Sequence, residues 1–304
     1  MADDVLRSMF AGAAATAVVR TAEAPLERIK ILLQNQNLAC EGHRPYTGAG
    51  DAALRVLKEQ GFLAFWRGNL TNCVRVVPSS ALRFTFMDRL QELAATGLPP
   101  SPGGGSPVLP LHRQMLSGAM SGALTSFVVF PLDLTRTKLA ADVGAHRQFS
   151  GIIDCVRQTT RQHGWRGNYR GLFVSVLEIT PYTALTMGGY EYFKRLLPAE
   201  SDGEGSVLGV LRKVGVGWIT GLVGSLVCYP LDTVKRQLML DGSTGFQSKY
   251  GGSTGTCMRI LYHEAGLRAF YRGCLFNAFK SAPSAALTLV ANDAFRNLLG
   301  FRKR

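Results

Sequence analysis

Apolar residues gather in six long segments, which fall into three pairs along the chain. The first segments of the pairs cover residues 7–37, 111–142 and 208–240, and the second segments cover residues 69–96, 172–197 and 274–299. An α-helix rises about 1.5 Å per residue, so each segment is long enough to cross the ~30 Å hydrocarbon core of a bilayer. The pattern predicts six transmembrane helices, with short helices in the polar, basic stretch inside each pair.

Charged residues lie inside these apolar segments, where a helix that faces only lipid would have none. They are Arg20, Arg75, Arg83, Glu178 and Lys280. A charged group at membrane depth is costly and normally faces a water-filled interior. The predicted fold class is therefore an all-α membrane protein, with six transmembrane helices around a central aqueous cavity.

Several sequence features recur three times in the same order, which indicates an internal repeat. The first is a proline with an acid two residues later and a base five residues later, and it begins at Pro25, Pro131 and Pro230. A Tyr/Phe-x-Gly motif and an aromatic-base-Gly triplet follow in each copy. The triplets end at Gly68, Gly171 and Gly273. We therefore divide the chain into repeats at residues 1–100, 101–200 and 201–304, which form one integrated transmembrane domain.

The acid and the base after each proline are predicted to close one end of the cavity. A proline inside a helix removes one backbone hydrogen bond and bends the helix, so three equivalent bends bring three helix ends together. Acids and bases of neighbouring repeats then pair, with Asp133 as the nearest candidate partner of Lys30. The ring consists of Glu27, Lys30, Asp133, Arg136, Asp232 and Lys235. The alternative is local pairing along each helix, worth roughly a few tenths of a kcal/mol.

A second set of polar residues ends the other three long segments and is expected to close the opposite end of the cavity. The set comprises Asp88, Gln91, Glu191, Lys194, Asp293 and Arg296. Gln91 stands where the other two repeats have a base, so this ring is one ion pair short. Two rings that alternate in occupancy provide a basis for alternating access, because a ligand drives such a change by binding the two states differently.

Three residues at equivalent positions mark the candidate substrate site. Arg75, Glu178 and Lys280 each lie seven residues after a triplet glycine and three residues before a proline. Equivalent positions on three related helices meet near the cavity axis, and different side chains there suit an asymmetric ligand. Two cations suit a phosphate-bearing anion. The remaining candidate substrate contacts are two further cations and two residues placed to flank a planar base: Arg20, Arg236, Ile179 and Tyr182.

Glu178 is the exceptional member of this site, because it is an acid in a basic cavity. We expect its carboxylate to be ionised and paired with Lys280 or Arg75. Three roles stay open for it: to offset a neighbouring cation, to bind an amino or guanidino group of the substrate, or to carry a coupling proton.

Composition narrows the function classes. Lys and Arg number 34 against 21 Asp and Glu, and the net charge of +13 favours anionic partners. A nucleic-acid reader would carry its bases on an exterior face with aromatic side chains, whereas many bases here lie inside apolar segments. The five histidines lack metal-ligand spacing, and neither a P-loop nor a G-x-G-x-x-G motif follows a strand pattern. We therefore expect no enzyme, no nucleic-acid partner, no metal and no cofactor.

The threefold motif and the triplets resemble those of the mitochondrial carrier family over essentially the whole chain. Within that family the chain is most similar to the ADP/ATP carriers, in the stretches 59–63, 65–70 and 136–144. The resemblance implies a multi-pass protein of the mitochondrial inner membrane that exchanges ADP and ATP and acts as a monomer. It also implies that the proline-motif ring and the short helices lie on the matrix side, and that the second ring lies on the cytoplasmic side.

The same resemblance implies cardiolipin as a lipid partner, near the triplets and the Tyr/Phe-x-Gly motifs. Backbone amides at helix N-termini are good phosphate ligands, which gives this expectation a mechanism. The implied lipid-binding residues are Gly48, Arg67, Gly68, Gly151, Arg170, Gly171, Gly251, Arg272 and Gly273. Gln34 is implied as a brace beside the first ion pair of the matrix-side ring.

Two departures from the ADP/ATP carriers leave the cargo open. Those carriers have three arginines and three methionines after the third proline motif, whereas residues 235–240 here read Lys-Arg-Gln-Leu-Met-Leu. Lysine lacks the bidentate phosphate contact of arginine. Glu178 also stands where nucleotide carriers have glycine. The alternatives are a carrier of another nucleotide-like or phosphorylated cargo such as coenzyme A or ATP-Mg/phosphate, a carrier of an amphoteric cargo, and a transport-deficient carrier fold that serves as a structural subunit.

Overall fold

The chain is helical throughout the part that this computed structural model describes, which is residues 2–38, 46–96, 109–142, 148–196, 207–243, 246–278, Leu287 and Ala291. The long helices are α1 (Ala2–Asn35), α3 (Asn69–Ala95), α4 (Leu111–Ala141), α6 (Leu172–Leu196) and α7 (Val207–Leu240). They coincide with five of the six predicted apolar segments. The sixth, 274–299, lies mostly outside the described residues.

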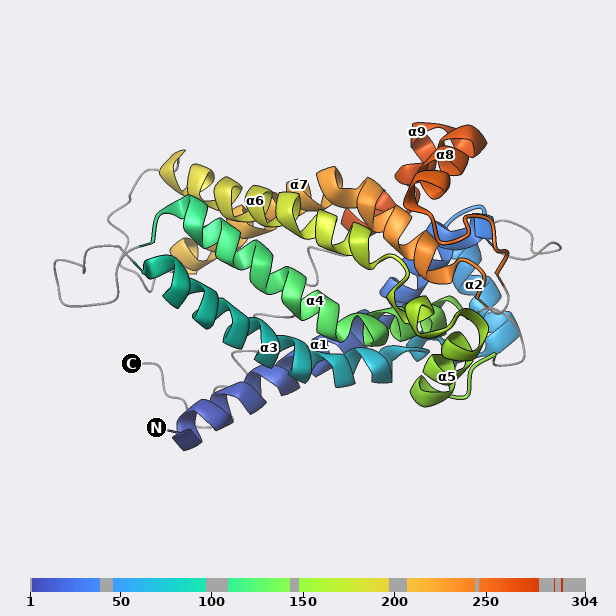
Figure 1. Cartoon of the computed structure of the whole chain (residues 1–304), viewed down its shortest axis with the longest axis horizontal. Helices are drawn as coiled ribbons and strands as arrows, with labels where there is room; N and C mark the ends of the chain where they lie inside the picture. The colour runs from blue at the N-terminus through green and yellow to red at the C-terminus, as the bar shows by residue number, and fades with distance from the viewer. Residues whose placement is uncertain are drawn as a thin grey trace.

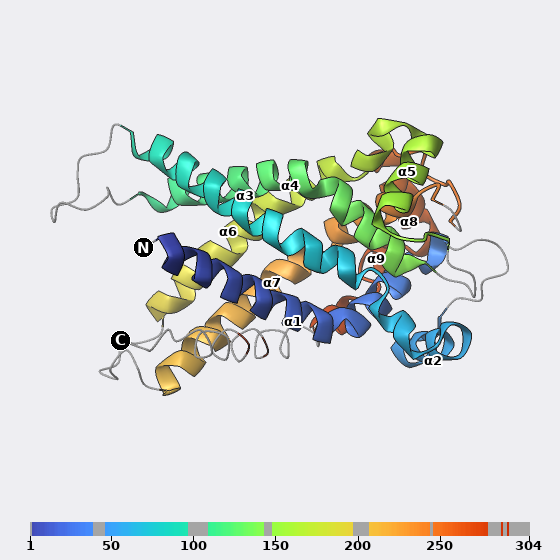
Figure 2. The same cartoon turned by 90° about the horizontal axis from the view of Figure 1, so that it is seen from below.

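Short helices occupy the polar stretches between paired long segments, as predicted. They are α2 (Ala49–Gln60), α5 (Ile152–His163), α8 (Thr254–Ala265) and α9 (Leu267–Phe270), with single 3-10 turns at η1 (Gln36–Leu38), η2 (Phe62–Trp66) and η3 (Trp165–Tyr169). The long helices run alongside one another, and α2, α5 and α8 gather at one end of the molecule (Figure 1). The view from below shows the same arrangement, with α1 beginning near the opposite end (Figure 2).

The best-packed core joins this end of the long helices to the short ones. Three of the short helices, α2, α5 and α8, bury residues four apart, which lie on one helix face: Ala52 and Val56, Cys155 and Thr159, and Cys257 and Leu261. The core continues into the C-terminal halves of α1, α4 and α7 through Ile31, Ala140 and Leu238. Burial raises the pKa of the Cys155 thiol to about 11 and that of Cys257 to about 12, so both thiols stay protonated and act as packing groups.

Away from this core, large apolar side chains stay exposed along the long helices. Examples are Leu70 on α3, Phe127 on α4 and Phe173 on α6. By length and composition, α4 is the one helix among the described residues that is apolar enough to cross a membrane. Charged residues such as Arg75 and Glu178 lower the hydropathy of the other long helices. Helices of this kind need a neighbour or a water-filled space for their polar side.

Candidate substrate cavity and gate

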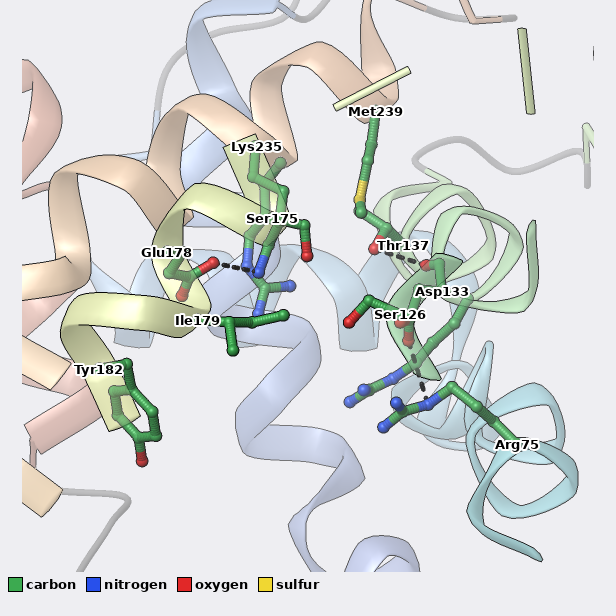
Figure 3. Close-up of a pocket in the computed structure, with 12 residues that line it drawn as sticks. Arg75, Ser126, Asp133, Thr137, Ser175, Glu178, Ile179, Tyr182, Lys235 and Met239 are labelled. Atoms are coloured by element: carbon green, nitrogen blue, oxygen red, sulfur yellow. Dashed lines mark hydrogen bonds and ion pairs between the residues drawn. The ribbon is translucent and has the colours of Figure 1, made fainter. Parts of the chain in front are cut away.

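A cavity of about 280 Å³ lies among four long helices, and most of its lining is polar. Its lining residues are Arg75 from α3; Ser126, Asp133, Arg136 and Thr137 from α4; Ser175, Glu178, Ile179 and Tyr182 from α6; and Lys235, Arg236 and Met239 from α7. Figure 3 shows most of these side chains around the space. Five of the seven predicted substrate contacts are among them: Arg75, Glu178, Ile179, Tyr182 and Arg236.

Four lining residues were not predicted: Ser126, Thr137, Ser175 and Met239. The helical period would have found them. Ser175 lies one turn before Glu178, and Met239 lies one turn after Lys235, so each shares a helix face with a residue already recognised. On α4, Thr137 follows Asp133 by four residues in the same way. The hydroxyl groups of Ser126, Thr137 and Ser175 give the cavity neutral hydrogen-bonding groups beside its charges.

Charge in this cavity is positive overall. Arg75, Arg136, Lys235 and Arg236 line it against two carboxylates, Asp133 and Glu178. Both carboxylates are engaged. Glu178 Oε2 lies 2.5 Å from Lys235 Nζ, and Asp133 Oδ1 lies 3.1 Å from Arg75 Nε (Figure 3). The prediction that Glu178 is paired is therefore confirmed, but Arg75 as its partner is wrong, since α7 presents Lys235 directly to α6.

Below the cavity, two ion pairs join neighbouring repeats through the proline-motif residues. Arg136 Nη2 lies 2.5 Å from Glu27 Oε2, which joins α4 to α1. Lys30 Nζ lies 3.0 Å from Asp232 Oδ2, which joins α1 to α7. These pairs link different helices, so the alternative of purely local pairing does not describe them. We call the six proline-motif charges the matrix gate, after the role predicted for them from the sequence.

Asp133 as the partner of Lys30 is wrong. In each pair that forms, the base belongs to one repeat and the acid to the repeat before it. Arg136 of the second repeat pairs with Glu27 of the first, and, because the repeats close into a ring, Lys30 of the first pairs with Asp232 of the third. The same order would pair Lys235 with Asp133. That third pair is absent from the described residues, because Glu178 holds Lys235 and Arg75 holds Asp133. The predicted ring of three pairs is thus formed at two positions.

Side chains around Asp232 reinforce the Lys30 pair. Gln34 Nε2 donates to Asp232 Oδ2 at 3.3 Å and to Thr233 Oγ1 at 3.4 Å, so Gln34 lies beside an ion pair of the gate as expected. Arg236 Nε lies 3.1 Å from Asp232 Oδ1. Lys30 Nζ also lies 5.2 Å from the ring centre of Tyr229, within range of a cation–π interaction.

Gln237 replaces one of the arginines that the ADP/ATP carriers have after the third motif. It is buried. Its Nε2 donates to the carbonyl of Gln34 at 2.9 Å, and its Oε1 accepts from the Tyr250 hydroxyl at 2.6 Å. The residue therefore fastens α7 to α1 and to the loop before α8.

Several predicted residues lie apart from the cavity or outside the described residues. Arg20 does not line the cavity, and its Nη1 lies 3.3 Å from Glu23 Oε2 on the same helix. Asp88 is exposed, and no ion pair of it occurs among the described residues; Gln91 is partly exposed. Lys280, Asp293 and Arg296, and the side chains of Glu191 and Lys194, are not described. The second ring therefore stays a prediction.

Comparison with known proteins identifies the chain's family. A sequence model described as mitochondrial carrier protein matches residues 2–97, 108–201 and 206–303. The chain belongs to the mitochondrial carrier family. The three matches imply three carrier repeats, in agreement with the internal motifs. Membership of this family of transporters makes the chain a carrier.

Individual relatives cover nearly the whole carrier. ADP/ATP translocase 4 of Bos taurus is 36% identical over 298 residues, which are 96% of this chain and 89% of the relative. ADP/ATP translocase 3 of Homo sapiens is 34% identical over 311 residues, covering 96% and 97%. A mitochondrial substrate carrier family protein of Dictyostelium discoideum is 35% identical over 300 residues, covering 97% and 94%.

The first two triplet glycines of the carrier repeats pack against a long helix of the next repeat, Gly68 against α4 and Gly171 against α7. A Cβ on Gly68 would lie 3.1 Å from the carbonyl oxygen of Arg136, and one on Gly171 would lie 3.0 Å from that of Lys235. Both glycines also have positive φ, 83° and 90°. Only glycine fits this combination of backbone conformation and close approach. The triplets thus contact the gate bases through the main chain, which the sequence did not reveal.

The triplet arginines form cross-repeat links. Arg67 Nη1 lies 3.8 Å from Asp142 Oδ2, and Arg170 Nη1 donates to the carbonyl of Asp241 at 2.9 Å. Asp241 also accepts hydrogen bonds from three main-chain amides of the loop before α8: those of Lys249, Tyr250 and Gly252. These arginines were predicted as lipid ligands, but the structure gives each of them a protein partner.

A second cavity, of about 260 Å³, lies between the first two repeats on the outer side of the gate. Gly68 and Gly151, which directly precede α3 and α5, both line it, together with Arg67, Trp66 and Leu70. The N-termini of two helices therefore border one space with partly apolar walls. In the third repeat, a Cβ added to Gly252 would lie 3.4 Å from Arg170 Nε. A Cβ added to the predicted lipid-binding residue Gly251 would have no atom within 4 Å.

Proposed function

We propose that this carrier exchanges ADP and ATP across the mitochondrial inner membrane by alternating access. The observation that carries the proposal is the cavity itself, where four cations stand beside Ile179 and Tyr182. Arginine binds phosphate oxygens through two parallel hydrogen bonds, and an aliphatic and an aromatic side chain can cover the two faces of a purine. The ADP/ATP translocases among the relatives support this cargo.

The proposed topology is six transmembrane helices around this cavity, with α2, α5 and α8 on the matrix side. The exposed apolar residues of the long helices, such as Phe127 and Phe173, then face lipid. The charged residues inside those helices face the cavity, which removes the cost of placing them in hydrocarbon. A single chain encloses the whole site, so the carrier acts as a monomer.

The matrix gate closes the cavity toward the matrix through Glu27–Arg136 and Lys30–Asp232, with Gln34 as a brace. The predicted cytoplasmic residues, Asp88 and Gln91 among them, close the other end in the alternate state. Lys280 and Arg20 complete the cationic path for phosphate. Differential binding of the cargo in the two states supplies the free energy that switches them.

Cardiolipin is the proposed occupant of the cavity between the first two repeats. The free amides at the N-termini of α3 and α5 would receive its phosphates, and Leu70 and Trp66 would cover its acyl chains. The same contact is proposed for the N-termini of α6 and α8, near Gly171 and Gly252, and near Gly48 and Gly273 between the third and first repeats.

Glu178 favours a second candidate cargo. A carboxylate in the cavity cancels part of the attraction for a highly charged nucleotide, so a less anionic phosphorylated cargo is the alternative. The two candidates differ in the charge that the cavity must neutralise, and a panel of cargoes in one assay separates them.

Reconstitution into liposomes tests the proposed function. Vesicles loaded with ADP should take up labelled ATP, and ADP should raise the unfolding temperature of the purified carrier by binding its folded state. Arg75→Gln should lower uptake strongly. Arg89→Gln, an exposed arginine on the same helix, is the matched control and should transport normally. Stabilisation by coenzyme A or phosphate, without any by adenine nucleotides, would overturn the ADP/ATP assignment.

A further inference from the structure

Two uncharged side chains of α6, Ile179 and Tyr182, line the substrate cavity at positions three residues apart, so they lie on one face of the helix. Figure 3 shows both on the α6 side of the space, across from Arg75. Ile179 is partly exposed, and Tyr182 is 41% exposed. The position of each side chain in the cavity therefore depends on what packs behind it, on the helices that flank α6.

Behind Ile179 lies a buried glycine of α4, Gly122. A Cβ on Gly122 would lie 3.0 Å from Ile179 Cγ2, whereas two carbon atoms attract each other best at about 3.5–4.0 Å. An isoleucine in a helix has one strongly preferred rotamer, so Ile179 cannot simply rotate away. An alanine at Gly122 would therefore shift Ile179 itself by a few tenths of an ångström.

Tyr182 rests on a second buried glycine, Gly224 of α7, which also packs against α6. A Cβ on Gly224 would lie 3.5 Å from both Cδ2 and Cε2 of the Tyr182 ring and 3.1 Å from Thr186 Cγ2. The Thr186 hydroxyl donates to the Tyr182 carbonyl at 2.8 Å, so Thr186 is tied to the turn that carries the ring. Gly224 thus leaves room both for the ring and for the residue that holds its main chain.

Neighbouring glycines on the same two helices lack this relation to the cavity. Gly118 lies one turn before Gly122, and its Cβ would come no closer than 3.5 Å to a described atom, Thr183 Cγ2, which is an ordinary contact. Gly221 lies one turn before Gly224, and its Cβ would have no described atom within 4 Å. Among these four glycines, the close approach is confined to the two that pack behind the cargo-flanking side chains.

We propose that Gly122 and Gly224 set the positions of the two cargo-flanking side chains and so determine which planar base the carrier accepts. They are positioning residues, because neither is among the residues that line the cavity. The inference rests on the proposed function, since it concerns the base of a nucleotide and leaves the phosphates to the cations of the cavity. A larger residue at either glycine should therefore weaken binding of the nucleotide without weakening binding of its phosphate groups.

Titration calorimetry of the purified carrier in detergent tests this inference, with ADP and inorganic pyrophosphate as separate probes. The wild type should bind both. Gly122→Ala should raise the dissociation constant of ADP about tenfold, the low end of what one methyl group is worth in a binding pocket, and leave that of pyrophosphate unchanged. Gly118→Ala is the matched control on α4 and should change neither constant. Gly224→Ala should act in the same direction but more weakly, because its contact with the ring is an ordinary one, and Gly221→Ala is its control.

Second-site variants show whether the displaced side chain causes the effect. Thr186→Ser deletes the Cγ2 atom that a Cβ on Gly224 would meet and keeps the hydroxyl that bonds to Tyr182. In that background, Gly224→Ala should no longer weaken ADP binding. Ile179→Leu likewise removes the methyl branch at Cβ, and adding Gly122→Ala should then change ADP binding by less than about twofold, because the two sites no longer interact.

The two probes separate failure of the inference from failure of the proposed function. If the wild type binds ADP but the glycine variants weaken ADP and pyrophosphate equally, the glycines serve helix packing alone, which overturns the positioning role and leaves nucleotide exchange intact. Unchanged ADP binding in both glycine variants has the same meaning. A wild type that binds pyrophosphate but not ADP overturns the nucleotide cargo and the inference together. Should Gly122→Ala fail to fold, the Gly224 series with Thr186→Ser decides the question.

Discussion

Two regions of the matrix gate are built from the same motif and differ in their partners. Where α1 meets its neighbours, Glu27 pairs with Arg136 and Lys30 pairs with Asp232, both between proline motifs. Where α4 and α7 face each other, Asp133 and Lys235 do not pair with each other. The difference is the presence of Arg75 and Glu178, which the cavity supplies at this position alone among the described residues.

The comparison teaches that a motif fixes where charges lie but not which of them pair. A charged side chain can form an ion pair with any opposite charge within about 4 Å, whether or not that charge belongs to the motif, because the Coulomb energy depends on distance and surroundings. In this carrier the choice at the third position joins the gate to the cargo site. At the first two positions the pairs are made between motif residues, although Asp232 also lies 3.6 Å from Lys235, the lysine that Glu178 holds.

The largest expected loss of unfolding free energy follows from removing the charge of Asp232, the gate acid with the most contacts. Asp232 is buried and accepts contacts from Lys30, Gln34 and Arg236. Asp232→Asn keeps the shape but leaves two cations without their carboxylate, which we expect to cost ~3–5 kcal/mol of unfolding free energy. Asp133, its counterpart in the second repeat, has a partly exposed side chain, so Asp133→Asn should cost clearly less. Thermal unfolding in detergent measures both, and equal costs would contradict the distinction between the two regions.

Charge reversal sharpens the assignment of partners. Lys30→Glu places two acids side by side and should slow exchange in liposomes by about tenfold, which corresponds to ~1.4 kcal/mol. Asp232→Lys should restore part of the rate, because it re-forms the pair with opposite polarity. Asp133→Lys is the matched control and should restore nothing. Rescue by Asp133→Lys would instead support the pairing of Lys30 with Asp133 that the motif predicted.

Coupling energies give a smaller but more selective readout. A double-mutant cycle of Glu27→Gln and Arg136→Gln should give a coupling of ~1–3 kcal/mol, as expected for residues in direct contact. The corresponding cycle for Asp133 and Lys235 should fall below ~0.5 kcal/mol. Similar values in the two cycles would show that the gate is symmetric in solution.

The smallest effect is expected at a surface pair within one repeat. The Thr47 amide, and then Arg55, hold the pKa of Asp51 below its usual range. A carboxyl with a lowered pKa contributes stability above its unfolded pKa and loses it only as the pH falls through the folded one. Because a surface pair is worth little, Asp51→Asn should lower the unfolding temperature only slightly, and the difference from the wild type should not vary between about pH 6 and 8. A clear shift would mean that surface pairs rival the gate.

The sequence was sufficient for most of the fold and for the composition of the site. Long apolar runs predicted α4 and α7 nearly to the residue, and spacing from the triplets placed Arg75 and Glu178 at the cavity. The membrane itself is not part of this agreement, and the six-span topology stays a proposal.

Partner choice and main-chain contacts were not predictable. Which acid meets Lys30 depends on the direction in which the repeats follow one another around the axis, and no local pattern records that direction. Arg28 is another example: it is buried, and it donates to the carbonyls of Ala64 and Asp142 and to Gln60. Such contacts join residues far apart in the chain. In the sequence, Arg28 stands among other polar residues, and nothing near it indicates these partners.

The packing of the triplet glycines has a consequence for how the membrane and the gate influence each other. Gly68 precedes α3 beside the proposed lipid cavity, while its α-carbon rests against the carbonyl of Arg136. Gly171 stands in the same relation to Lys235. A displacement of a gate base would therefore press on the adjoining turn. If the proposed lipid fills that cavity, it would brace the turn and the base together, and the lipid composition of the membrane would then influence how stiffly the gate opens.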